Sequence, residues 1–187
     1  ISMESGTENL DWTARVLRRI IEFTEAGGTI HVLLDGVSVG AQSYFNAEAT
    51  MLMHTRGVLI MTPGGSMVLT GKRALDASGA VSAEDERGIG GYERIMGPNG
   101  QAQYLAGDLA HAFRILLNHY EYSYIAPSEQ TVRRLATVDP EDRDITLETY
   151  PGDDFELVGD LFGELNAERK RPFAVRAVMA AVADKDG

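Results

Sequence analysis

The chain has 187 residues, of which 44% are hydrophobic and 24% charged, and these values suit one globular domain with a sizeable core. The formal net charge of −11 argues against nucleic-acid binding, which needs clustered positive charge, and the absence of cysteine excludes disulfides and thiolate chemistry. No apolar run reaches the roughly 18 to 20 residues of a membrane span, and the first residues lack the segments of a signal peptide. We therefore expect a cytoplasmic protein without membrane contact, and the absence of an initiator methionine indicates a piece of a longer chain.

The first third of the chain predicts alternating helices and strands, an order that favours an α/β layered domain. An amphipathic helix is expected at 11–26, followed by a short buried strand at 29–34. A second helix is expected at 45–54 and a second buried strand at 58–61. The apolar stripe of the first helix is expected to consist of Trp12, Val16, Leu17, Ile20, Ile21 and Phe23.

The segment 62–107 is rich in glycine and lacks a long period, so we expect it to carry function or to pack against a partner. Asp108 is expected to cap the clearest helix of the sequence. Its apolar face is expected to contain Leu109, Ala112, Phe113, Leu116, Leu117, Tyr120 and Tyr124.

The last third of the chain changes composition, and 127–154 is rich in charge, proline and threonine, which is typical of a linker or surface excursion. A short helix is expected at 155–162, and Pro172 is expected to begin a last amphipathic helix. One side of that helix, which needs a surface to cover it, is expected to carry Val175, Val178, Met179 and Val182.

Two glycine-rich segments resemble nucleotide-binding motifs but do not match them. The segment 65–72 resembles a P-loop but has five residues between its glycines where four are required, and Arg73 stands where a magnesium-binding hydroxyl is needed. The segment 88–91 is not a dinucleotide fingerprint, because Glu93 stands where the third glycine is required. The four histidines show no metal-ligand spacing, and no nucleophile elbow is present, so we expect neither a metal site nor a serine hydrolase.

One constellation remains, the small-residue turn at 35–44 between the first predicted strand and the second predicted helix. Small residues let a substrate approach the backbone, and free amides at a helix start can stabilise a developing oxyanion. A tight turn that needs glycine for geometry alone explains the same residues, so the pattern leaves both interpretations open.

The sequence of this turn and the following helix, GVSVGAQSYFNAEATMLMHTRGVLIMTP (36–63), resembles the N-terminal, crotonase-like half of the carboxyltransferases of biotin-dependent acyl-CoA carboxylases. TGKRALDASGAVSAEDERGIGGYERIMGPNGQAQY (70–104) is most similar to the single-chain, multidomain enzymes of that family. PFAVRAVMAAVAD (172–184) is similar to the family segment that leads towards the C-terminal half.

The resemblance implies an α/β fold of the crotonase type, a ββα superhelix, with a partial N-terminal carboxyltransferase subdomain at 1–126. It implies that 127–187 is a linker and helical segment that leads to a C-terminal half outside this chain. It further implies carboxyl transfer from carboxybiotin to the α-carbon of an acyl-CoA, with the backbone amides of Gly40 and Ala41 as an oxyanion hole and Gly90-Gly91 as a supporting active-site loop.

The partners implied by the resemblance are an acyl-CoA, a biotin carboxyl carrier domain, the C-terminal half and further copies of the enzyme in a homo-oligomer. Biotin would arrive on a separate carrier domain, since the chain lacks the biotin-carrying lysine motif. Basic residues that could meet the CoA phosphates are Arg56, Lys72, Arg73 and the run Arg169-Lys170-Arg171.

Two alternatives remain open. An enoyl-CoA hydratase or isomerase of the crotonase fold would need positioned carboxylates, and the candidates are Glu48 and the run Glu84-Asp85-Glu86. The chain could also be an inactive structural fragment of the multidomain carboxylase.

Overall fold

The computed structural model describes residues 6, 8–151 and 154–186, and the chain separates into two compact units, Ile1–Ala126 and Pro127–Gly187. Each unit has its own apolar core. Within the described residues, no helix combines the length and the apolar character needed to cross a membrane.

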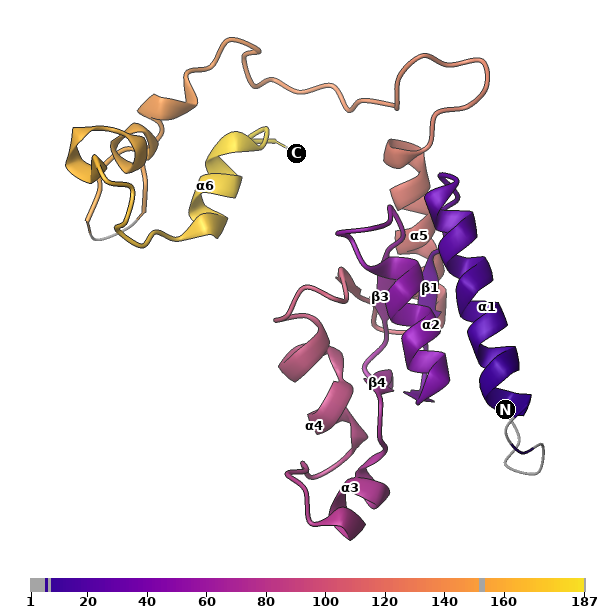
Figure 1. Ribbon diagram of the computed structural model, residues 1–187. Coiled ribbons are helices and arrows are strands. Elements are labelled where there is room, and N and C mark those ends of the chain that lie inside the picture. Colours follow the sequence, from indigo (N-terminus) through magenta and orange to yellow (C-terminus); the bar gives the residue numbers. More distant parts are fainter. Residues whose placement is uncertain (1–5, 7, 152–153, 187) are drawn as a thin grey trace. The chain divides into compact units, whose positions relative to one another are not determined.

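The first unit is built on a parallel sheet of three strands in the order β1-β3-β5 (Figure 1). These strands are β1 (Val32–Leu34), β3 (Leu59–Met61) and β5 (Tyr104–Leu105), and Leu33 pairs with Ile60 in the register. β1 and β3 confirm the two strands predicted from the apolar runs, within shorter bounds. β5 was not predicted, because two residues are too few to show a period.

Apolar side chains of the central strand point alternately to the two faces of this sheet, as a pleated strand requires. Leu59 and Met61 pack on one face with Leu34 and with Ala47 of the second helix. On the other face, Val58 and Ile60 pack with Ala112, Ile115 and Leu116 of a later helix. The sheet is therefore covered on both sides, which is the usual environment of parallel strands.

A second parallel sheet has two strands, and the Gly40-Ala41 turn follows one of them. β2 (Val37–Val39) pairs with β4 (Ser66–Val68), so that Val39 lies opposite Val68. All three residues of β4 are buried, whereas β2 buries only its middle residue, Ser38.

The helices of the first unit differ from the prediction mainly in their bounds. The helix predicted at 45–54 begins four residues earlier, and 62–107, where the sequence shows no long period, contains several short elements. These elements were missed because five to seven residues do not establish a helical period. The helices are α1 (Glu8–Glu25), α2 (Ala41–Thr50), α3 (Lys72–Ser78), α4 (Glu86–Gly90), the π-helical turn η2 (Tyr92–Met96) and α5 (Leu109–Ser123).

α1 packs against α2, and Figure 1 shows the two helices side by side. The predicted stripe of α1 is only partly used, because Trp12, Val16 and Phe23 remain about half exposed. α5 begins as predicted at Asp108, whose carboxylate accepts the N–H of His111 at 2.6 Å.

Only part of the predicted apolar face of α5 is buried. Ala112 is 1% exposed and Leu116 packs against the core, while Phe113 and Leu117 are mostly exposed. Periodicity identified the helix correctly, but the stripe was too wide to indicate which of its edges faces the sheet.

The second unit has a small core of Tyr150, Phe155, Val158 and Leu161. Its elements are the 3-10 turns η3 (Ile145–Leu147), η4 (Val158–Phe162) and η5 (Glu164–Asn166) and the helix α6 (Val175–Val182). α6 places Ala177, Val178 and Ala181 on this core, whereas Val175, Met179 and Val182 of the predicted stripe stay exposed. The expected short helix at 155–162 is the turn η4, and α6 begins three residues after Pro172.

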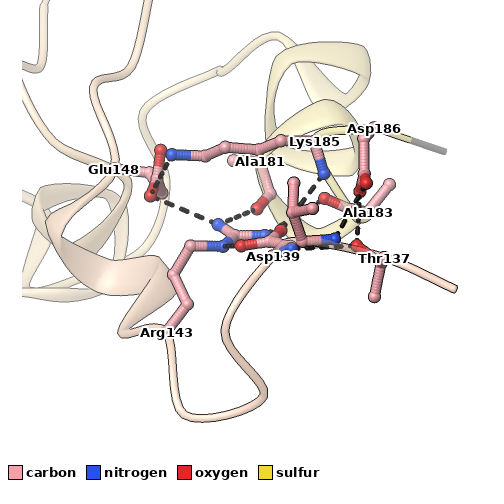
Figure 2. Close-up of polar contacts among 9 residues, drawn as sticks. Thr137, Asp139, Arg143, Glu148, Ala181, Ala183, Lys185 and Asp186 are labelled. Atoms are coloured by element: carbon pink, nitrogen blue, oxygen red, sulfur yellow. Dashed lines mark hydrogen bonds and ion pairs between the residues drawn. The ribbon is translucent and has the colours of Figure 1, made fainter.

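An ion-pair cluster around Arg143 fastens the C-terminal end of α6 to the segment predicted as a linker (Figure 2). The Arg143 guanidinium donates to the carboxylate of Asp139 at 2.7 Å and to the carbonyl oxygens of Ala181 and Ala183 at 2.9 and 3.1 Å. Glu148 contacts both Arg143 and Lys185, at 3.3 and 3.0 Å. The C-terminal part of the segment 127–154 is therefore integrated into the fold of this unit.

Candidate functional site

The Gly40-Ala41 turn joins β2 to α2. Gly40 caps α2 with φ 64° and ψ −128°, a backbone conformation that favours glycine. Its N–H donates to the carbonyl oxygen of Val68 at 3.0 Å, which ties the turn to the end of β4. The Gly40 amide, predicted as an oxyanion donor, is thus occupied by a backbone partner in this structure.

The four amides that follow Gly40 in α2 differ in their partners. Those of Ser43 and Tyr44 donate to the carbonyl oxygen of Gly40 at 2.9 and 3.3 Å. Among the described residues, no hydrogen bond uses the N–H of Ala41 or of Gln42. Both therefore remain available to an acceptor outside the chain, as is usual for the first amides of a helix.

Buried polar side chains lie under this turn. Ser38, Ser43 and Asn46 are 5%, 8% and 6% exposed. The Ser43 hydroxyl lies 2.8 Å from the carbonyl oxygen of Ser38 and 2.9 Å from that of Val68, and Asn46 donates to the Ser38 hydroxyl at 3.2 Å. This network was not predicted from the sequence. Its signal was a serine between two β-branched residues of a strand and two polar residues spaced three apart on the inner side of a helix.

Gly90 and Gly91 end α4 against the other side of β4. A methyl group at Gly90 would lie 2.0 Å from the carbonyl oxygen of Met67, so only glycine permits this approach. The N–H of Gly91 donates to Arg87 at 2.8 Å, and Gly91 forms an antiparallel bridge to Ser66. These contacts position α4 on β4.

Strand β4 thus brings the two predicted glycine sites into one neighbourhood. The end of β4 holds the Gly40-Ala41 turn, and its first two residues contact Gly90-Gly91. A pocket of about 300 Å³ opens beside Gly91. It is lined by Pro63, Asp85, Arg87, Gly88, Gly91, Tyr92, Glu93, Arg94 and Leu105.

The run Glu84-Asp85-Glu86, considered for acid-base chemistry, makes hydrogen bonds that stabilise the local fold. Asp85 caps α4, and the hydrogen bond from the N–H of Gly88 lowers its pKa. The pKa of Glu84 is also lowered, first by a hydrogen bond from its own backbone N–H and then by Arg94. One oxygen of Glu86 accepts the N–H of Lys72 at 2.9 Å, at the start of α3. The lowered pKa values of Glu84 and Asp85 favour carboxylates that stay ionised, unlike a general acid near neutral pH.

Glu48, the other candidate carboxylate, lies on α2 and is half-buried. Among the described residues, no group of three or more metal-binding side chains is arranged to hold a metal ion.

The basic residues considered for phosphate binding are dispersed. Arg56 is exposed after α2, and Arg73 is exposed on α3. Lys72 forms an ion pair with Asp76 at 2.7 Å. In the second unit, Lys170 pairs with Glu168 at 2.7 Å, and the guanidinium of Arg171 lies 6.0 Å from the ring centre of Phe155.

Comparison with known proteins gives a fold. No model of a protein family matches the sequence, and no curated protein matches it. Solved structures do match in fold, and two of them show the extent of the likeness. The β subunit of geranyl-CoA carboxylase from P. aeruginosa matches 100% of this chain and 30% of its own, with a TM-score of 0.52 and 17% identity. Transcarboxylase 12S, solved as a hexamer with hydrolysed methylmalonyl-coenzyme A bound, matches 97% of this chain and 31% of its own, with a TM-score of 0.56 and 20% identity.

The chain shares its fold with parts of these two proteins. This confirms the crotonase-like α/β fold expected from the resemblance. The chain spans less than a third of the length of each of the two.

Proposed function

We propose that this chain forms one wall of the active site of a biotin-dependent acyl-CoA carboxylase carboxyltransferase. The observation that carries the proposal is the pair of unpartnered amides, Ala41 and Gln42, at the start of a ten-residue helix. They occur in a fold shared with two carboxyltransferase subunits, at the turn whose sequence resembles that family.

The proposed reaction places its demand on hydrogen-bond donors. The α-carbon of the acyl-CoA loses a proton and forms a bond to the carboxyl carbon, while the bond from that carbon to the biotin nitrogen breaks and the nitrogen takes up the proton. Negative charge collects on the thioester oxygen as the α-proton leaves. Two fixed N–H donors at a helix start stabilise that charge without reorganising.

The surroundings of the two amides suit an acyl thioester. Val37 and Val39 on the outer face of β2, Tyr44 on α2 and Leu69 after β4 are each about half exposed. An apolar surface of this kind can accept the acyl chain or the pantetheine arm, while the amides bind the polar carbonyl. When bound, carboxybiotin supplies the carboxyl group.

We extend the proposal from the amides to the whole chain. Residues 1–126 form the partial N-terminal subdomain, and 127–187 lead to a C-terminal half that completes the site. Biotin arrives on a carrier domain, and the active form is a homo-oligomer. The amides Ala41 and Gln42 replace the pair Gly40 and Ala41 expected from sequence, because the Gly40 N–H already donates to Val68.

The experiment measures carboxylation of propionyl- to palmitoyl-CoA with carboxybiotin, with and without an added C-terminal carboxyltransferase half. Carboxylation that requires the added half supports the proposal. Hydration of an enoyl-CoA in place of carboxylation would overturn it in favour of a hydratase. A monomer that neither binds acyl-CoA nor carboxylates it with the added half would indicate a structural fragment.

A further inference from the structure

The residue that follows the two free amides, Ser43, carries a buried hydroxyl that the start of a helix does not itself require. Ser43 is 8% exposed and sits at the meeting point of β2, β4 and α2. A small apolar residue would fill this position between a helix and a sheet without the cost of burying a polar group. The serine hydroxyl is therefore not explained by packing alone.

The contacts of Ser43 span two strands. Its Oγ lies 2.8 Å from the carbonyl oxygen of Ser38 on β2 and 2.9 Å from that of Val68 on β4. A hydroxyl has one proton, so it donates to one of these oxygens at a time. The same Val68 oxygen accepts the N–H of Gly40 at 3.0 Å. One carbonyl at the end of β4 thus holds both the turn before Ala41 and the residue that follows Gln42.

A second side chain supports this arrangement. Asn46, one turn further along α2, donates from Nδ2 to the hydroxyl of Ser38 at 3.2 Å. Ser38, Ser43 and Asn46 therefore form a connected and buried set, and connected polar sets of this kind fix one geometry. The rotation of the first turn of α2 about its own axis decides where its free N–H groups point.

We propose that Ser43, supported by Asn46 through Ser38, is a positioning residue for the Ala41 and Gln42 amides. The inference rests on the proposed function, because it assigns these amides to the thioester oxygen. Ser43 itself does not touch the substrate. It holds the end of β4 and the start of α2 in one register, so that both amides face the same acceptor.

The test uses the full chain labelled with ¹⁵N, titrated with propionyl-CoA, and follows the amide resonances of Ala41 and Gln42. In the unsubstituted protein we expect both resonances to shift in proportion to binding. In Ser43→Ala we expect the shifts of the two amides to become unequal and smaller. The affinity should fall about tenfold or less, since the apolar contacts of the thioester remain.

Matched variants separate positioning from stability. Ser123→Ala removes a comparable hydroxyl, which donates to the carbonyl oxygen of His119 at 2.6 Å within α5, and we expect it to leave both shifts unchanged. Ser43→Cys keeps the shape with a weaker donor and should give intermediate shifts. It also serves as the informative variant if Ser43→Ala does not fold.

The outcomes distinguish two failures. If the unsubstituted protein binds propionyl-CoA without shifting either amide, the proposed function fails together with its oxyanion site. If the two amides shift in the unsubstituted protein and their shifts are the same in folded Ser43→Ala and Ser43→Cys as in the unsubstituted protein, the proposed function stands. The positioning role of Ser43 is then overturned.

Discussion

At the scale of residues, adding a methyl group at Gly90 tests how closely α4 must approach β4. At Gly90 the added carbon would lie 2.0 Å from the carbonyl oxygen of Met67, a backbone atom that cannot move aside alone. We expect Gly90→Ala to destabilise the first unit by about 3 kcal/mol, through overpacking, and to displace α4. Denaturant unfolding measures this. Gly64→Ala is the control, since its methyl group would meet only Thr62 Oγ1 at 3.9 Å. Equal stability of the two variants would contradict the close approach.

His31 makes the first unit sensitive to mild acid. Its Nδ1 accepts the N–H of Val58 at 3.2 Å, and its ring contacts the rings of His119 and Tyr120 on α5. Burial lowers the pKa of His31, and the nearby His119 lowers it further. The folded state therefore favours neutral His31, so stability is complete above the ordinary pKa of 6.5 and falls as the pH drops below that value. The loss levels off below the lowered pKa.

The measurement is thermal unfolding between neutral and mildly acidic pH. His31→Asn keeps an acceptor near the position of Nδ1 but does not titrate, so we expect it to remove part of the stability loss in this range. His54→Asn changes an exposed histidine and should leave the pH dependence as it is. A pH profile unchanged by His31→Asn would show that the contact with Val58 does not depend on protonation.

At the scale of elements, the cluster around Arg143 holds the C-terminal end of α6 to the segment that contains Asp139 and Glu148. Arg143 is 13% exposed at its side chain and Asp139 3%, and the guanidinium caps the last carbonyl groups of α6. We expect Arg143→Met to speed hydrogen exchange of the α6 amides while leaving exchange in the first unit unchanged. Arg176→Met, on the exposed side of α6, is the control. Equal exchange in both variants would contradict the capping role.

The same cluster predicts a separate response to stronger acid. The hydrogen bond from Arg143 lowers the pKa of Asp139, and that from Lys185 lowers the pKa of Glu148. Carboxyl groups with lowered pKa values stabilise the fold above their ordinary pKa and lose that contribution as the pH falls through the lowered values. The protection factors of the α6 amides, which compare each exchange rate with its intrinsic rate at the same pH, should therefore fall at a lower pH than the transition of His31, and a fall at the same pH would contradict this assignment.

The elements that could be predicted from sequence are those whose apolar residues repeat often enough. α1 and α5 met that condition, and Asp108 added a capping signal, whereas β1 and β3 were predicted because each lies in a continuous apolar run. α2 was predicted four residues late because its first turn consists of small and polar residues. β4, β5, α3 and α4 have two to seven residues, fewer than a period needs, and their positions depend on contacts distant in sequence.

The candidate site was predictable in place but not in detail. Glycine at positions 40, 90 and 91 marked turns and close approaches, and the structure brings them to one strand. No sequence pattern could show that the Gly40 N–H bonds to Val68 and leaves Ala41 and Gln42 free, because Val68 lies 28 residues away on another strand. The network of Ser43 is hidden for the same reason.

At the scale of the whole molecule, the proposed chemistry depends on backbone more than on side chains. The chain carries a formal net charge of −11, which opposes an anionic CoA ester at long range. Backbone donors at a helix start act locally and need no positive side chain. The proposed chemistry therefore depends on the N–H groups of Ala41 and Gln42, of which that of Ala41 can be removed by a single substitution.

Substitution Ala41→Pro removes this N–H while leaving the helix intact, since proline is well tolerated at the first position of a helix. Leu109→Pro makes the same change at the first position of α5 and serves as the control. The decisive measurement is the rate of carboxyl transfer to propionyl-CoA by the chain assembled with a C-terminal half. We expect Ala41→Pro to lower kcat about 10²- to 10³-fold and to weaken acyl-CoA binding by about tenfold or less, while Leu109→Pro stays active. Full activity in folded Ala41→Pro would contradict it.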